Sequence, residues 1–325
     1  MTIFAVMKKK GTFFLPAAFL LVILLAGGGL LCGGVTLTPG EVWQGLLGQG
    51  EAAGIVRGIR LPRVLTALLA GAALALSGAQ MQAVFRNPLA DPHIMGVSGG
   101  AGRGAALATV KSIGTAGIAL SAFAGALATS LLVLLAARRF PGSGTLLIFG
   151  VMLGFIFSAL TSLVEYTANE ESLKLFYSWA AGSFQGAGAS GVWGMAGALA
   201  VGAALALWQG KGLDLLLFGD EYAALSGAPV GRIRSLAVLG CCLMTGTITA
   251  FCGPLGFVGI IAPHIARRLG ATSAHRTVLP GSILTGAILS LAADILAQAF
   301  PTPVPAGSTL ALLGIPLILV IMMRK

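Results

Sequence analysis

The segment from Arg60 to Gly104 places the strongest constraint on how this chain can fold. After Arg63 it continues through about 20 mostly apolar residues, enough for a helix that rises about 1.5 Å per residue to cross a bilayer. A polar turn with two prolines interrupts it at Arg86–Pro92, and a second apolar phase, rich in small residues, begins at Ile94. The pattern predicts a membrane helix, a hard turn at one membrane surface, and a second helix suited to close packing.

The composition of the whole chain fits lipid as its solvent. Hydrophobic residues make up 57% of the 325 residues and charged residues only 9%, with a mean hydropathy of +0.95. A soluble domain carries about 25% charged residues. The 48 glycines favour helices that approach one another closely. The net charge of +10 is carried by residues at the ends of apolar runs, so it indicates membrane topology and not nucleic-acid binding.

Ten apolar segments predict an all-α integral membrane fold, with about ten transmembrane helices packed in a single domain over residues 1–325 and both termini cytoplasmic. The predicted helices cover Phe13–Leu31, Leu61–Val84, Ile94–Val110, Gly114–Ala137, Leu146–Tyr166, Val192–Trp208, Ser235–Cys252, Leu255–Leu269, Val278–Ala297 and Ser308–Met323. With this alternation, 14 of the 20 Lys and Arg residues face the cytoplasm, five face outside, and Arg103 lies within a helix. This bias is the one that the positive-inside rule requires.

The first of these segments could instead be a signal peptide. The apolar run after Lys8–Lys10 is longer than the apolar core of about 7–15 residues that signal peptides carry, and no clear cleavage site follows it. We therefore expect a retained first helix.

The sequence carries no constellation of residues that would make the chain an enzyme. It has no G-x-x-x-x-G-K-[ST] phosphate loop, and its three histidines lie in separate segments without metal-ligand spacing. No directly bound cofactor or metal is expected. An ion-gradient-driven secondary transporter is the alternative function, but such proteins use membrane acids as relays. Only Glu165 and Asp294 lie near predicted helices, and both are close to helix ends.

Five motifs follow one another along the chain. They are R-L-P-R at Arg60–Arg63, R-N-P-L-A-D-P-H-I-M-G-V-S-G-G-A from Arg86, G-D-E-Y-A-A-L-S-G at Gly219–Gly227, G-F-V-G-I-I-A-P-H-I-A-R at Gly256–Arg267, and A-A-D-I-L-A at Ala292–Ala297. Together they resemble the FecCD/BtuC family, the permease subunits of type II ABC importers for ferric siderophores, haem and cobalamin.

The resemblance implies a homodimer of this subunit around a central translocation path. It also implies two separate ATPase subunits, which use the ATP, on the cytoplasmic face, and an extracytoplasmic substrate-binding protein on the outside. The expected cargo is a metal chelate that crosses the cytoplasmic membrane of a bacterium or archaeon. A ferric siderophore ranks first, with haem or cobalamin next.

The resemblance assigns a docking role to arginines at the outer surface. Arg60 and Arg63, at the external start of the second predicted helix, are expected to meet glutamates of the binding protein. Anchoring to lipid headgroups is the alternative. Where the family often has a third arginine, this chain has Gln298, so Arg57 or Lys174 is expected to supply the missing charge.

A cytoplasmic gate is expected in the turn after the second predicted helix. Asn87 and Leu89 match positions that resemble the family's gate, although a plain connection between helices is the alternative. A second constriction is predicted from Ser143 to Thr145, before the helix at 146–166.

A short helix on the cytoplasmic surface is predicted within the polar segment 211–234. Asp220 and Glu221 favour the start of a helix, and Gly227 favours its end. Through the resemblance this segment is the loop that couples to the ATPase, with an ordinary solvated loop as the alternative. The residues expected to carry the coupling are Asp220, Glu221, Tyr222, Ala223, Leu225 and Gly227.

Arg103 and three hydroxyl residues are the candidates for the translocation path. An arginine inside the membrane costs at least about 2.5–3.5 kcal/mol unless it faces water or a partner. Two interpretations of Arg103 are open: it lines the path and favours an anionic substrate, or it is satisfied internally by Glu165 or by backbone carbonyls. Ser158, Thr161 and Ser162 are predicted to line a smooth, weakly binding path.

Overall fold

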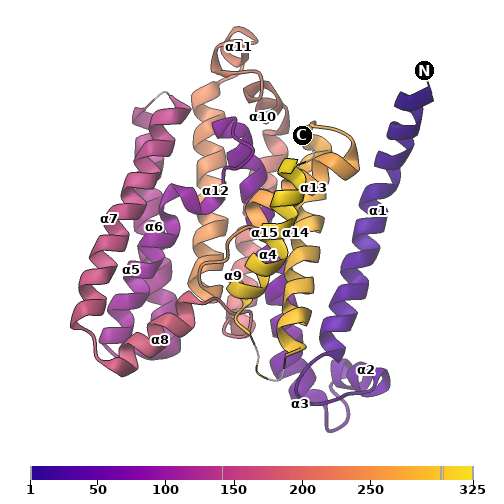
Figure 1. Cartoon of the computed structure of the whole chain (residues 1–325), viewed down its shortest axis with the longest axis vertical. Coiled ribbons are helices and arrows are strands. Elements are labelled where there is room, and N and C mark those ends of the chain that lie inside the picture. The colour runs from indigo at the N-terminus through magenta and orange to yellow at the C-terminus, as the bar shows by residue number, and fades with distance from the viewer. Residues whose placement is uncertain (1, 141, 301, 303, 324–325) are drawn as a thin grey trace.

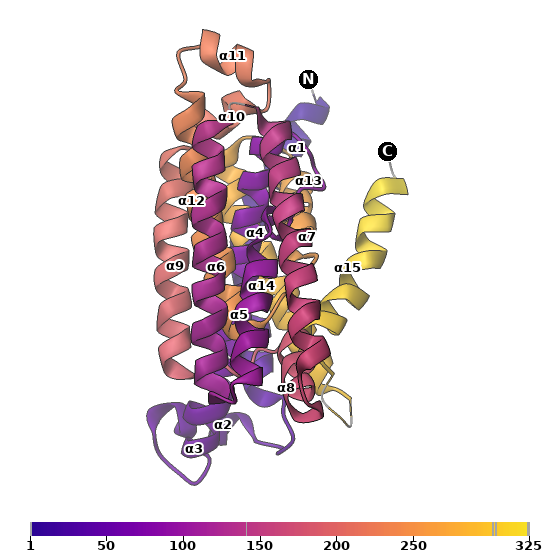
Figure 2. The same ribbon diagram turned by 90° about the vertical axis from the view of Figure 1, so that its left-hand side faces the viewer.

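The computed structural model describes residues 2–140, 142–300, 302 and 304–323, and these residues form helices joined by loops, with no strand among them. In the elongated bundle of Figure 1 and Figure 2, the start of α1 (Thr2–Leu31) and the end of α15 (Ala306–Met323) lie at the same end of the bundle as α10 (Gly210–Leu216) and α11 (Asp220–Leu225). The opposite end holds α2 (Pro39–Leu47), α3 (Ala53–Ile55) and α8 (Glu170–Ala180). We call these the α11 end and the α2 end. The start of α1, the end of the described chain and α11 thus share one end of the bundle, and the cytoplasmic location of that end stays a prediction.

Every predicted membrane segment is helical over most of its length. These helices are α1 (Thr2–Leu31), α4 (Leu61–Phe85), α5 (Val97–Val110), α6 (Gly114–Arg139), α7 (Ser143–Thr167), α9 (Gly188–Trp208), α12 (Val230–Cys252), α13 (Val258–Gly270), α14 (His275–Gln298) and α15 (Ala306–Met323). A π-helical turn, η1 (Val56–Arg60), leads into α4, and a 3-10 turn, η2 (Pro92–Met95), precedes α5. Arg324 and Lys325, which we counted among the cytoplasmic charges, lie outside the described residues.

Seven helices in the described part of the chain are long and apolar enough to cross a membrane. By contrast, α5 has 14 residues and α13 has 13, so they reach only about 20 Å, less than the hydrocarbon core of about 30 Å. The predicted helix starts at Ile94 and Leu255 were wrong. Gly96, in the left-handed region at φ 75°, separates η2 from α5, and the backbone before Val258 is not helical. The count of ten crossings stays a prediction.

Irregular backbone inside the bundle finds its hydrogen-bond partners within the protein. Near the end of α12, the Ser183 amide donates to the Cys252 carbonyl at 2.8 Å. At the start of α15, the Ala306 amide donates to the Gly182 carbonyl at 3.0 Å. Non-helical backbone at membrane depth is stable only where protein or water satisfies its polar groups. These bonds therefore let the chain contain short helices without leaving peptide groups exposed to lipid.

Glycines set the distance between α4 and α14 at the centre of the bundle. A Cβ atom added to Gly71 would lie 2.2 Å from the Gly286 carbonyl oxygen, and one added to Gly286 would lie 2.2 Å from the Gly71 oxygen. A Cβ on Gly78 would lie 1.9 Å from the Gly259 oxygen of α13. Helix α4 is continuously buried from Ala70 to Phe85. The close packing expected from the glycine content is thus concentrated around this central helix.

Candidate functional site

Arg60 lies inside the protomer at the α2 end and not on its surface. Its side chain is 5% exposed, and Nη1 donates to the carbonyls of Leu30 and Leu31 at 2.7 and 3.1 Å. Its Nη2 donates to the Val35 carbonyl. These acceptors include the last carbonyls of α1, where a cation complements the helix dipole. Arg60 therefore stabilises the end of a different helix from its own.

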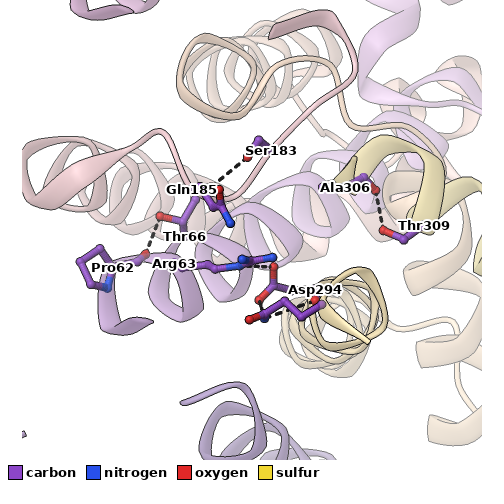
Figure 3. Close-up of polar contacts among 9 residues, drawn as sticks. Pro62, Arg63, Thr66, Ser183, Gln185, Asp294, Ala306 and Thr309 are labelled. Atoms are coloured by element: carbon purple, nitrogen blue, oxygen red, sulfur yellow. Dashed lines mark hydrogen bonds and ion pairs between the residues drawn. The ribbon is translucent and has the colours of Figure 1, made fainter. Parts of the chain in front are cut away.

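Arg63 joins α4 to α14 through a buried ion pair (Figure 3). Its Nε lies 2.7 Å from Asp294 Oδ1, and the two side chains are 13% and 2% exposed. Gln298 Nε2 donates to the other carboxylate oxygen, Asp294 Oδ2, at 3.0 Å. The residue that replaces the family's usual arginine thus supplies a hydrogen bond to the partner of Arg63. The Arg63 guanidinium therefore binds a carboxylate of its own chain.

A cavity of about 200 Å³ lies beside this ion pair at the α2 end. It is lined by Arg63 and Asp294, by Ser183 and Gln185 in the loop after α8, and by residues 304–306 at the start of α15. Figure 3 shows Gln185 reaching toward the arginine from that loop, while Ser183 Oγ accepts a hydrogen bond from the Gln185 amide. The loop after α8 and the segment at the start of α15 therefore face the same cavity as the ion pair.

Arg57, Lys111 and Lys174 are exposed cations at the α2 end. Arg57 donates from Nε and Nη2 to the Leu46 carbonyl at 3.0 and 2.7 Å, at the end of α2. Helix α2 begins with a capping box, in which hydrogen bonds from the backbone and side chain of Thr38 lower the pKa of the Glu41 carboxyl. Docking of a binding protein through Arg57, Arg60 or Arg63 stays a prediction, and the geometry favours the exposed Arg57 as the accessible charge.

The turn after α4 is held by its own polar atoms. Asn87 Oδ1 accepts a hydrogen bond from the Leu89 amide at 2.9 Å, so the asparagine side chain stabilises the turn. Leu89 is exposed, and the Pro88 carbonyl lies 3.0 Å from His264 Nε2 on α13. The turn is therefore tied to α13, and its gating role stays a prediction.

The prediction that Ser143 and Thr145 lie before a helix was wrong. Both are in the first turn of α7, where Ser143 is buried and Thr145 is exposed. A constriction formed by this stretch stays a prediction.

The path candidates on α5 and α7 divide into buried and exposed residues. Arg103 Nη1 donates to the Leu160 carbonyl of α7, which matches the internal interpretation with a backbone carbonyl and not with Glu165. Thr161 is buried, and its hydroxyl donates to the Phe157 carbonyl at 2.8 Å, so it does not line an open surface. Ser158 and Ser162 are exposed. Their contact with a substrate stays a prediction.

Because Arg103 links two helices, we expect Arg103→Ala to weaken the packing of α5 on α7. Loss of a charged hydrogen bond costs about 1.5–3 kcal/mol, so the melting temperature of the detergent-solubilised protein should fall. Transport of anionic and neutral cargoes should fall together. A selective loss of anionic cargo, with an unchanged melting temperature, would instead place Arg103 in the path.

The α11 end carries a helix that projects from the bundle (Figure 1). Its anchor is an ion pair in which Arg234 Nη2 lies 2.6 Å from Asp220 Oδ2, with the arginine buried in α12. Within α11, Ala223 is buried, whereas Tyr222 is exposed and Leu225 is 89% exposed. Gly227, at φ 80°, ends the segment as predicted. Residues 230–234 of the predicted loop belong to α12 instead.

Sequence reasoning missed two parts of this surface. Phe218, just before α11, is exposed and packs against Tyr222 with the two rings tilted, their centroids 5.4 Å apart. Asp214 on α10 accepts hydrogen bonds at Oδ1 from the His275 amide at 2.8 Å and from the ring, whose Nδ1 lies 2.7 Å away. Phe218 could have been found from the sequence, because an aromatic residue in a polar segment is a signal for a surface contact. The contact between Asp214 and His275 gives no such signal, because the two residues are far apart in the sequence.

Comparison with known proteins identifies this arrangement. The model of the FecCD transport family matches residues 18–324. The chain belongs to the FecCD transport family. It is similar to the vitamin B12 import system permease protein BtuC of Salmonella typhi, with 38% identity over 303 residues, covering 90% of this chain and 91% of the relative. The corresponding protein of Salmonella paratyphi A (strain ATCC 9150 / SARB42) is 39% identical over the same coverage.

Solved structures agree with this membership. One solved structure is reported as an inward-facing conformation of a transporter assigned to the metal-chelate ABC type. It superimposes on this chain with a TM-score of 0.85 at 30% sequence identity, and the match covers 97% of this chain and 100% of the solved one. PsaBC from Streptococcus pneumoniae, in complex with Fab, shares the fold, with a TM-score of 0.56 at 18% identity, over 87% of this chain and 95% of its own. The family, the all-helical permease fold and the location in a membrane are therefore confirmed.

Proposed function

We propose that this FecCD-family chain is the membrane-spanning subunit of an ATP-driven importer of a metal chelate in the cytoplasmic membrane. A separate ATPase hydrolyses the ATP, and two copies of it dock on a dimer of this chain. An extracytoplasmic substrate-binding protein delivers the cargo at the α2 end. The observation that carries the proposal is the group of exposed side chains at α11, namely Phe218, Tyr222 and Leu225. Exposed apolar side chains that gather outside the membrane mark protein interfaces.

Cobalamin is the first cargo to test. The relatives at 38–39% identity are vitamin B12 permeases, which supports cobalamin ahead of the ferric siderophore that we ranked first from motifs alone. Ferric siderophores and haem follow, since the structural relative at 30% identity is of the metal-chelate type. A secondary transporter receives little support, because Asp294, one of its two candidate acids, is already paired with Arg63.

Transport into proteoliposomes tests the proposal. The vesicles would contain this chain with its cognate ATPase, with and without the binding protein, and would receive cobalamin, ferric siderophore or haem. Uptake of one cargo that requires both ATP and the binding protein is expected. Uptake by this chain alone, driven by an ion gradient, would contradict the proposal and support the secondary transporter.

Leu225→Glu tests the contact with the ATPase. Because Leu225 is 89% exposed, the substitution should leave the permease folded. We expect recovery of the ATPase with the permease, and ATP-dependent uptake, to fall by about tenfold, which corresponds to about 1.4 kcal/mol of binding free energy. The matched control is Leu47→Glu, at an exposed leucine of the α2 end, which should leave ATPase recovery unchanged. Equal recovery in both variants would exclude α11 as the contact.

A further inference from the structure

A proline inside α13 leaves one carbonyl of that helix without its usual partner. In an α-helix each amide donates to the carbonyl four residues earlier, and Pro263, which has no amide hydrogen, cannot donate to Gly259. Both residues are buried. A buried carbonyl of this kind needs a donor from elsewhere in the protein. We call residues 264–270, which follow the proline, the second half of α13.

Gln82 of α4 supplies that donor. Its side chain is 3% exposed, and Nε2 donates to the Gly259 carbonyl and to the Ile260 carbonyl, each at 3.2 Å. Gly78 lies four residues earlier on the same face of α4, where an added Cβ would come within 1.9 Å of the Gly259 oxygen. Gly78 therefore lets α13 approach, and Gln82 satisfies the carbonyl that the proline leaves without a donor.

The same side chain also holds α13 beyond the proline. Gln82 Oε1 accepts a hydrogen bond from Arg267 Nη2 at 2.7 Å, and Arg267 belongs to the second half of α13. A hydrogen bond from a charged donor is stronger than one between neutral groups. One glutamine therefore connects to α13 on both sides of Pro263.

The turn after α4 is attached to the same two elements. The Asn87 amide donates to the backbone carbonyl of Gln82 at 3.2 Å. His264, the first residue of the second half of α13, has its Nε2 3.0 Å from the Pro88 carbonyl. Because a carbonyl can only accept, the imidazole donates from Nε2 in this contact. The turn is thus bonded to α4 on one side and to the second half of α13 on the other.

We propose that α13 bends at Pro263 during import, and that the turn after α4 moves with its second half through the contact of His264 with Pro88. Gln82 is the positioning residue of this hinge, because its hydrogen bonds span the proline and set the angle between the two halves. Bending there breaks no hydrogen bond to the Pro263 amide, since that bond is already absent. The motion during import rests on the proposed function, whereas control of the angle by Gln82 does not.

Distances between two spin labels, measured by electron paramagnetic resonance, test the hinge. The full transporter in nanodiscs would carry Cys32→Ser, since the other three cysteines are buried. The labels would be at Leu269→Cys on the second half of α13 and at Leu239→Cys on α12, both exposed positions. In the wild-type hinge we expect their separation to change when ATP binds to the complex.

Two substitutions should alter the hinge in opposite ways. Gln82→Met keeps the length of the side chain but removes its hydrogen bonds, so the distribution of distances should widen. Pro263→Ala returns an amide to the Gly259 carbonyl, so the separation should no longer change with ATP, and the melting temperature should not fall. We expect each variant to lower ATP-driven uptake by about tenfold, the factor that corresponds to one buried hydrogen bond.

Gln80→Met is the matched control. Gln80 is also buried in α4, but its Nε2 donates within its own helix, to the Leu76 carbonyl at 3.5 Å, and its Oε1 has no partner among the described residues. Replacement of such a side chain by an apolar one of similar shape is nearly neutral. The distance distribution and the uptake of Gln80→Met should therefore match those of the wild type.

A purely structural role of Gln82 would lower the melting temperature and the uptake of Gln82→Met together and leave the distance distribution unchanged. That result would overturn the proposal. A Pro263→Ala transporter whose label separation still changes with ATP would also overturn it, and this variant does not depend on Gln82→Met reaching the folded state. Labels at Leu89→Cys and Leu269→Cys that move apart when ATP binds would show that the turn does not follow α13. Absence of ATP-driven uptake in the wild type would refute the proposed function, while widening in Gln82→Met would still support control of the angle by Gln82.

Discussion

Asp294→Ala is expected to prevent most of the protein from reaching the folded state. The substitution leaves the guanidinium of Arg63, only 13% exposed, without its carboxylate between α4 and α14. Removal of one member of a buried ion pair costs about 3–5 kcal/mol, because the remaining charge stays buried without compensation. The loss would appear as a reduced monodisperse peak in size-exclusion chromatography and a lower melting temperature in detergent. Glu171→Ala, at an exposed acid of α8, is the control and should behave as wild type.

A double substitution separates packing from docking. Apolar replacement of both members of a buried pair is often neutral, so Arg63→Met with Asp294→Leu should restore the folded protein. If the double variant folds and still binds the substrate-binding protein, Arg63 acts only inside the protomer. If it folds and loses that binding, the docking role predicted from the sequence is correct. A stable Asp294→Ala protein would show that the ion pair contributes little.

Gly71→Ala is expected to destabilise the protein by about 3 kcal/mol or more, the upper range for overpacking, because the new Cβ would lie 2.2 Å from a backbone oxygen that cannot rotate away. Gly197→Ala on α9 is the matched control, since an added Cβ there meets nothing within 4 Å. In a helix interior, alanine is favoured over glycine by about 0.5–1 kcal/mol. The two substitutions should therefore shift the melting temperature in opposite directions.

Shifts of the same sign and size for these two variants would contradict the close crossing of α4 and α14. Gly286→Ala provides an independent check, because its Cβ would lie 2.2 Å from the Gly71 oxygen. It should reproduce the effect of Gly71→Ala. The double variant should cost less than the sum of the two, since one separation of the helices relieves both contacts.

The sequence predicted features that depend on neighbouring residues. The apolar runs gave the order of the helices, and the acids and glycine around Tyr222 gave the short helix α11. The two half-length helices were predicted, but their starts were placed too early because hydropathy does not report a single left-handed residue such as Gly96. The resemblance identified the family correctly, although it ranked ferric siderophores before cobalamin, whereas the relatives reported above are vitamin B12 permeases.

The roles of the arginines could not be read from the sequence, because their partners are remote. Arg60 binds carbonyls about 30 residues earlier in the chain, and Arg63 binds a carboxylate 231 residues later. A motif fixes where such a cation lies but not which acceptor it meets.

The glycine crossing of α4 and α14 has a consequence for biogenesis. Gly71 is made early and Gly286 late, so the central helix enters the membrane long before its closest partner exists. During synthesis the face of α4 that is later covered by α14 must remain against lipid or an insertion chaperone. Chains that stop before α14 would keep that face open, which makes them recognisable to membrane proteases as unfinished products.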